Sequence, residues 1–156
     1  RGHAEHHFCV WDKASRGWFS GDMFGVSYPW CRFPEGDFLL PSTTPSQFDP
    51  EAYLASLKLL GSYTPRCMYL THYGALEYSL DKAQLLARQI DAYCEFVKAE
   101  DPDLARLQQR LSDYSLDLLR QFGASTTVSG MQRALAFDMR LNAQGLDVWR
   151  RRVSAS

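Results

Sequence analysis

The sequence lacks several features that would assign it to a particular class of protein. It has no excess of charge, because 17 Lys and Arg residues stand against 18 Asp and Glu residues. A general attraction to nucleic acid or to an anionic membrane is therefore excluded. No apolar run approaches the roughly 18 residues that a membrane span needs, and no basic and then apolar leader opens the chain. We expect a cytoplasmic protein that binds neither nucleic acid nor membrane.

Cysteine is also sparse, and its spacing excludes a disulfide framework. Cys9, Cys31, Cys67 and Cys94 stand far apart, with no C-x-x-C pair among them. Small secreted scaffolds carry a much denser set of cysteines. We expect four reduced thiols, most of them buried.

The first half of the chain alternates strand-like and loop-like segments. The β-prone runs 6–11 and 17–20 flank a polar turn and predict a hairpin, and the Pro-, Gly- and aromatic-rich segment 23–47 predicts a structured loop beside a site. Asp49-Pro50 then predicts a helix start, with apolar residues at helical spacing up to Gly61. The apolar run 66–70 fits a buried strand.

From Ser79 onward the sequence predicts helices only. One helix covers about 83–97, and a second opens at Asp101-Pro102 with leucines at near-heptad spacing that we expect to pack on a neighbouring helix. These two helices are expected to form an antiparallel pair. A third is expected over 129–142, with Gly145 separating or kinking it from 146–152. The predicted organisation is an α/β unit over 1–78 and an all-helical extension of three to four helices over 79–156.

Three residues at the ends of predicted strands could bind metal. His3 precedes the first strand, Asp22 follows the second and His72 follows the third, so all three can gather at one edge of a sheet. Two-metal hydrolysis needs imidazoles and carboxylates in such places, with one oxygen ligand between the two cations. We expect His3, Asp22 and His72 to be the metal ligands of this chain.

The segments around these residues resemble those of the metallo-β-lactamase superfamily. Gly2-His3-Ala4-Glu5-His6-His7 looks like its G-H-T-x-G-H segment, Ser20-Gly21-Asp22 is similar to its T-G-D segment, and Thr71-His72-Tyr73-Gly74 resembles its last ligand motif. The resemblance covers roughly residues 1–74 and implies the C-terminal half of an αββα sandwich. The family's H-x-H-x-D-H motif is absent, and the chain opens without an initiator Met. We therefore expect a fragment whose partner is the remaining N-terminal half of the fold.

The resemblance also implies a chemistry. The parent protein would be a hydrolase in which a metal-bound hydroxide attacks an ester, thioester, amide or phosphoester of a small-molecule substrate. Two divalent metal ions are implied, with Asp22 bridging them; zinc is expected and iron is the alternative. A di-iron oxidoreductase on the same scaffold is a second hypothesis. A third is a non-catalytic piece that acts only in assembly, including as a homodimer.

Other residues near the predicted ligands are weaker candidates. His6 and His7 add imidazoles, but in an alternating strand one faces the core, and the family's second His in this segment is commonly a structural hydrogen-bonding residue. Tyr28, Trp30 and Phe33 could line a substrate pocket or form a small core of their own, and we take Tyr28 as the substrate-binding candidate. No catalytic residue is assigned.

Overall fold

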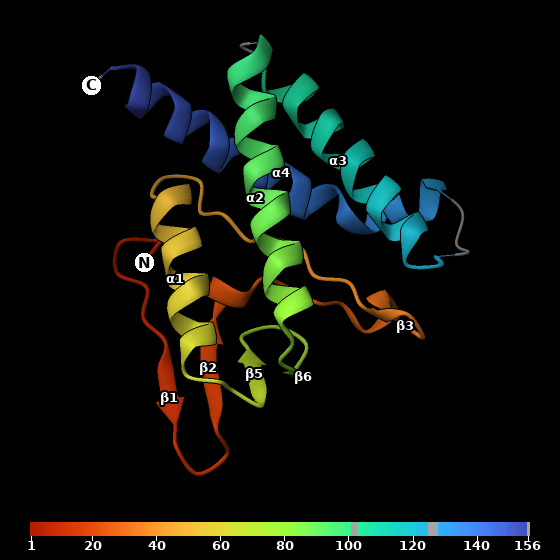
Figure 1. Ribbon diagram of the computed structural model, residues 1–156. Helices are drawn as coiled ribbons and strands as arrows, with labels where there is room; N and C mark the ends of the chain where they lie inside the picture. The colour runs from red at the N-terminus through yellow and green to blue at the C-terminus, as the bar shows by residue number, and fades with distance from the viewer. Residues whose placement is uncertain (101–102, 125–127, 156) are drawn as a thin grey trace.

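The protein is a mixed α/β structure with one small sheet and a set of long helices (Figure 1). The computed structural model describes residues 1–100, 103–124 and 128–155, and side chains are described for these except at 99, 100, 128 and 129. The strands are β1 (Val10–Asp12), β2 (Gly17–Gly21), β3 (Arg32–Phe33), β4 (Gly36–Asp37), β5 (Cys67–Leu70) and β6 (Ala75–Glu77). The α-helices are α1 (Pro50–Ser62), α2 (Leu80–Glu100), α3 (Leu104–Gln121) and α4 (Val128–Ser154), and two 3₁₀ turns span Asp22–Phe24 and Pro29–Cys31.

The main sheet has the strand order β1-β2-β5-β6. β1 and β2 form the predicted antiparallel hairpin, and β5 lies parallel to β2, with α1 in the connection between them. The prediction for the first strand was too long, because β1 begins only at Val10 and the residues after His3 form a turn and irregular backbone. β6, which pairs antiparallel with β5, was not predicted, since a strand this short carries little periodic signal.

Helix α1 covers one face of this sheet. Its N-cap is Asp49, whose side chain accepts from the N–H of Ala52 at 3.0 Å, as the sequence predicted. The Trp18 indole of β2 donates to the Leu60 carbonyl of α1 at 3.1 Å, so helix and sheet are joined by a hydrogen bond as well as by apolar packing.

The opposite face of the sheet is open to solvent. Val10, Phe19, Tyr69 and Ala75 are paired in register across the four strands, so their side chains share this face. Val10 is 49% exposed and Phe19 52% exposed, although both are β-formers suited to a buried surface. The sheet is therefore apolar on both faces and covered on one.

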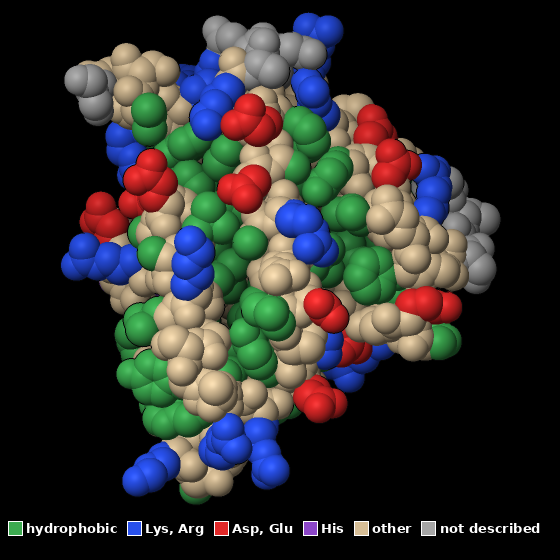
Figure 2. Space-filling view, viewed as in Figure 1, with side chains coloured by type: hydrophobic (Ala, Val, Ile, Leu, Met, Phe, Trp, Pro, Cys, Tyr) green, Lys and Arg blue, Asp and Glu red, His purple; other side chains and the backbone are tan. Residues whose placement is uncertain are grey.

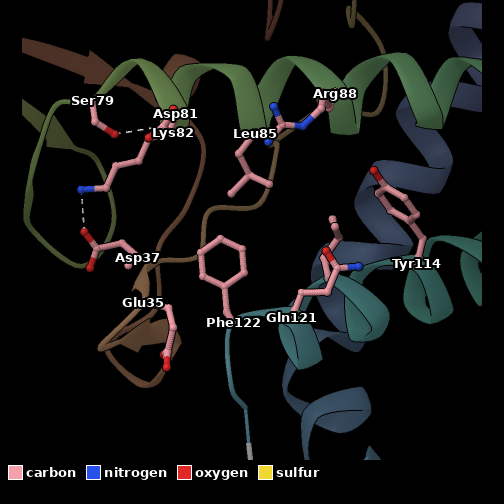
Figure 3. Close-up of a pocket in the computed structure, with 12 residues that line it drawn as sticks. Glu35, Asp37, Ser79, Asp81, Lys82, Leu85, Arg88, Tyr114, Gln121 and Phe122 are labelled. Carbon is pink, nitrogen blue, oxygen red and sulfur yellow. Dashed lines mark hydrogen bonds and ion pairs between the residues drawn. The ribbon is translucent and has the colours of Figure 1, made fainter.

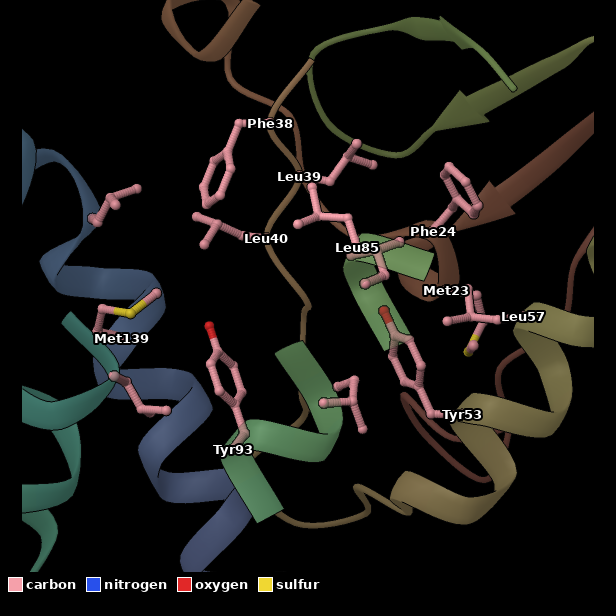
Figure 4. Close-up of a cluster of buried hydrophobic side chains, with 14 of the residues drawn as sticks. Met23, Phe24, Phe38, Leu39, Leu40, Tyr53, Leu57, Leu85, Tyr93 and Met139 are labelled. Carbon is pink, nitrogen blue, oxygen red and sulfur yellow. The ribbon is translucent and has the colours of Figure 1, made fainter. Parts of the chain in front are cut away.

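A single cluster of buried apolar side chains joins the sheet region to the later helices (Figure 4). Tyr53 of α1, Tyr93 of α2 and Met139 of α4 are all fully buried within it. The cluster thus includes residues on both sides of position 78. The division into units 1–78 and 79–156 stays a prediction.

The three later helices pack on one another, and α2 and α3 are in contact as predicted. α3 contacts α2, yet it packs more extensively along α4. Leucines of its stripe, such as Leu107 and Leu111, are buried in the common core, which confirms that this stripe serves helix packing. The N-cap of α3 is Asp103, whereas Asp101-Pro102 lies outside the described residues.

The predicted separation at Gly145 was wrong, because α4 is one continuous helix from Val128 to Ser154. Glycine disfavours a helix interior by only about 1 kcal/mol relative to alanine, and tertiary packing overrides that preference. Here the glycine meets the side chain of Thr43 and the backbone carbonyl of Thr44, which leave no room for a Cβ atom.

The outer surface over α1 and α2 carries many apolar side chains (Figure 2). Between the two helices lies a hollow of about 410 Å³ whose lining includes Leu54, Leu57 and Leu80. Among the described helices none is both long and apolar enough to cross a membrane.

All four cysteines are free, as the sequence predicted. Cys31 and Cys94 are buried, whereas Cys9 and Cys67 are partly exposed. Burial raises the pKa of the Cys31 and Cys94 thiols to about 12 and that of Cys9 to about 11.

Candidate metal centre

The topology of the sheet brings Asp22 and His72 to the same edge. β2 and β5 are parallel, so the residues that follow them emerge at the same end. The pairing register shifts between Phe19 and Gly21, which leaves Ser20 as an extra residue in β2. Such a bulge bends a strand and redirects the side chains that follow it, in this case Asp22.

Asp22 presents its two carboxylate oxygens to two different histidines. Oδ2 lies 3.5 Å from Nε2 of His3, and Oδ1 lies 3.7 Å from Nε2 of His72. Oδ1 is buried and makes no hydrogen bond within the described residues. The structure therefore brings together all three predicted ligand residues.

His3 is held with one ring nitrogen free to face Asp22. Its Nδ1 lies 2.7 Å from the carbonyl oxygen of Ser42, and because a carbonyl can only accept, this nitrogen carries the proton. Nε2 is then the ring nitrogen that faces Asp22. The Thr44 hydroxyl donates to the His3 carbonyl at 2.6 Å, so segment 42–44 fixes both the ring and the backbone of His3.

His7 supports the site without being available as an Nε2 ligand. Its Nε2 accepts the backbone N–H of Asp22 at 3.1 Å. Gly21 has φ 54°, and a Cβ atom there would lie 2.3 Å from this nitrogen, so glycine is required for the approach. Burial, and then the neighbouring His3, lower the pKa of His7, which keeps the ring neutral as the hydrogen bond requires. This agrees with a structural role.

His72 lies in the turn between β5 and β6 and is the most exposed of the three, with 56% of its side chain accessible. The next residue, Tyr73, has φ 67°, a conformation that is costly for a residue with a Cβ atom. The turn is held from outside: Arg32 donates to the Tyr73 carbonyl at 2.9 Å, and the Tyr73 ring packs on Tyr28 with 4.7 Å between centroids.

His3, Asp22 and His72 offer two imidazole nitrogens and the two oxygens of one carboxylate. A tetrahedral ion with bonds of about 2.1 Å separates its ligand atoms by about 3.4 Å, close to the two distances at Asp22. Each cation would receive one imidazole nitrogen and one carboxylate oxygen from this chain. In the part of the chain that the structure describes, no group of three or more His, Cys, Asp or Glu side chains is arranged to hold a metal ion by itself.

The predicted aromatic pocket wall is divided in two. Tyr28 and Trp30 stack at 5.4 Å beside Tyr73, whereas Phe33 packs against Phe122, the C-cap of α3. The Tyr28 hydroxyl donates to Asp138 of α4 at 2.7 Å. Its assignment as a substrate contact stays a prediction.

Two residues of α4 near the site were missed by the sequence reasoning. Asp138 is half-buried; burial raises its pKa, and the hydrogen bond from Tyr28 and, more weakly, the charge of His72 act in the opposite direction. Asn142 is buried and bonded to the backbone beside Ser42. Their partners lie about a hundred residues away in sequence, so no local pattern identified those partners.

A polar hollow of about 290 Å³ lies elsewhere, between α2, α3 and the β3–β4 hairpin (Figure 3). Lys82 of α2 forms an ion pair with Asp37 at 2.7 Å and donates to the Glu77 carbonyl at 2.8 Å. Phe122 lies at its centre in the view of Figure 3. Lys82 thus joins the hairpin and the end of β6 to α2.

The chain was compared with family models, curated proteins and solved structures. No family model, curated protein or solved structure matches it.

Proposed function

We propose that this chain is the C-terminal part of a metallo-β-lactamase-fold hydrolase and that His3, Asp22 and His72 supply half of its two-metal site. The observation that carries the proposal is the carboxylate of Asp22, whose oxygens face two different imidazoles. An aspartate that serves only a turn or a cap bonds nearby backbone N–H groups, as Asp12 and Asp49 do. Asp22 Oδ1 is instead buried without a hydrogen bond within the described residues.

Divalent cations bound here would lower the pKa of water and neutralise charge that develops on an ester, thioester, amide or phosphoester. The chain's own residues prepare the ligands for this. Ser42 fixes the tautomer of His3, and His7 holds the backbone of Asp22 in place. Outer hydrogen bonds of this kind are what orient metal-binding histidines and carboxylates in proteins.

The remaining ligands would come from the N-terminal half of the sandwich. Two features support this: each cation would receive only two donor atoms from this chain, and one apolar face of the sheet is open. A second sheet packed on that face would bury Val10 and Phe19 and complete the αββα layers. A homodimer through the same face is the competing arrangement, and the molar mass of the purified chain distinguishes them.

Zinc is the metal we propose, since imidazole with carboxylate suits it, although the same ligands also suit iron. Elemental analysis and the visible spectrum of the full-length protein separate the two. A colourless protein that holds only zinc supports hydrolysis, and a coloured protein with two irons supports the oxidoreductase.

The test of the proposal is the metal content of full-length protein carrying Asp22→Ala or His72→Ala. Each variant is expected to lose at least one metal ion and the hydrolytic activity. His6→Ala and Asp12→Ala are matched controls, because His6 is exposed and Asp12 serves only the hairpin turn. Unchanged metal content in both ligand variants would refute the proposal.

A further inference from the structure

Helix α4 presents three consecutive contacts to the two loops that hold the candidate ligands. Asp138, Asn142 and Gly145 are spaced by four and three residues, so they lie on one face of the helix. Each contacts a segment that touches His3 or the His72 turn. α4 also packs against α2 and α3, which fixes its position (Figure 1).

Asn142 serves the His3 side. Its side-chain oxygen accepts the Thr43 N–H at 3.0 Å, and its amide donates to the Pro41 carbonyl at 2.9 Å. These two bonds bracket Ser42, whose carbonyl accepts the hydrogen bond from His3 Nδ1. Asn142 is only 2% exposed, so a rigid, desolvated side chain holds the peptide that orients this imidazole.

Asp138 serves the His72 side. It accepts the hydroxyl of Tyr28, whose ring packs on Tyr73, the residue directly after His72. The left-handed conformation of Tyr73 needs such external support, because it is disfavoured for a residue with a Cβ atom. The Asp138 carboxylate therefore supports the His72 turn through the rings of Tyr28 and Tyr73.

We propose that this face of α4 is an outer layer of the metal site, in which Asn142 positions His3 and Asp138, through Tyr28, positions His72. The inference rests on the proposed function. The inference gives the helical segment after residue 79 a role in setting the metal affinity of the site, so this segment is more than an appendage.

The experiment measures zinc affinity by chelator competition in the full-length protein with Asn142→Ala and with Tyr28→Phe. Each is expected to weaken zinc binding roughly tenfold or more, as outer-layer substitutions do. Gln89→Ala and Tyr93→Phe are the matched controls. Gln89 is a buried amide that bonds the Leu39 carbonyl, and the buried Tyr93 hydroxyl lies 3.5 Å from that of Ser115, so both losses are structural only.

Two further variants separate positioning from loss of stability. Asp138→Asn keeps an oxygen that accepts from Tyr28 and is expected to retain near-wild-type affinity, whereas Asp138→Leu is expected to lose it. In a His72→Ala background, Tyr28→Phe should have no further effect on the remaining zinc, while Asn142→Ala should still weaken it.

The outcomes distinguish the two proposals. If Asp22→Ala and His72→Ala lose metal but Asn142→Ala and Tyr28→Phe bind zinc as tightly as their controls, the role of α4 is refuted and the metal site stands. If neither ligand variant loses metal, the site itself is refuted and the role of α4 with it.

Discussion

Gly145→Ala sets helix propensity against packing at one position of α4. Alanine is favoured over glycine in a helix interior by about 1 kcal/mol, so on local grounds the change should stabilise the protein. The added Cβ atom, however, would lie 2.5 Å from both the Thr43 hydroxyl and the Thr44 carbonyl oxygen. The hydroxyl can rotate away, but the carbonyl belongs to the backbone and must shift.

The magnitude follows from these two effects. Overpacking a well-packed site typically costs about 1–3 kcal/mol, and the propensity gain offsets about 1 kcal/mol of this. We expect Gly145→Ala to lower the free energy of unfolding by up to about 2 kcal/mol. The shifted backbone is that of Thr43 and Thr44, and the Thr44 hydroxyl donates to the His3 carbonyl, so zinc affinity should fall as well.

The assay is chemical denaturation of the full-length protein, with Gly61→Ala as the matched control. Gly61 is also in a helix, but its added Cβ atom would meet only the hydroxyl end of Tyr78, a flexible side chain that can move. The control is expected to be neutral or to gain up to about 1 kcal/mol. Stabilisation of Gly145→Ala to the same extent would refute the reasoning, because it would mean that α4 does not press on Thr44.

Three other changes test separate contacts. Lys82→Met should lower the free energy of unfolding by about 1–3 kcal/mol in denaturant, because it leaves the Asp37 carboxylate unpaired. The double variant with Asp37→Asn should recover much of the lost stability. Equal stability of the single and double variants would contradict the role of the ion pair. Cys31 and Cys94 should resist iodoacetamide at pH 8 until denaturant is added, since a pKa of about 12 leaves about one thiol in ten thousand ionised. Labelling is measured by mass spectrometry, and rapid labelling of the native protein would contradict the burial of these thiols. Phe19→Asp should leave the helices folded by circular dichroism but abolish association through the open sheet face, and an unchanged molar mass by light scattering would exclude that face as the contact.

The local signals in the sequence predicted the elements near the site well. Asp49-Pro50 marks the start of α1 because the cap and the first-turn proline act within one turn of the helix. The apolar run before His72 forms β5, and the hairpin before Asp22 forms β1 and β2. These features depend on residues close together in the chain, which is why periodicity and turn chemistry find them.

The contacts that orient the ligands depend on residues far apart, and no local pattern encodes them. His3 was expected to lie directly before a strand, yet it is held by Ser42 and Thr44 on a different loop. Glycine at 145 predicted a break because its local cost is visible in the sequence. Its benefit, close approach to Thr44, appears only in the folded protein.

The spacing of Asp138 and Asn142 shows where the sequence still held usable information. Two polar residues four apart in an amphipathic helix lie on one face, and in α4 that face also carries buried apolar residues such as Leu135 and Met139 nearby. Buried polar side chains need partners, so such a pair predicts that something polar packs on the helix even when the partner is unknown. What the fold supplies is the identity of those partners, the Ser42 segment and Tyr28, and through them the connection from α4 to both histidines.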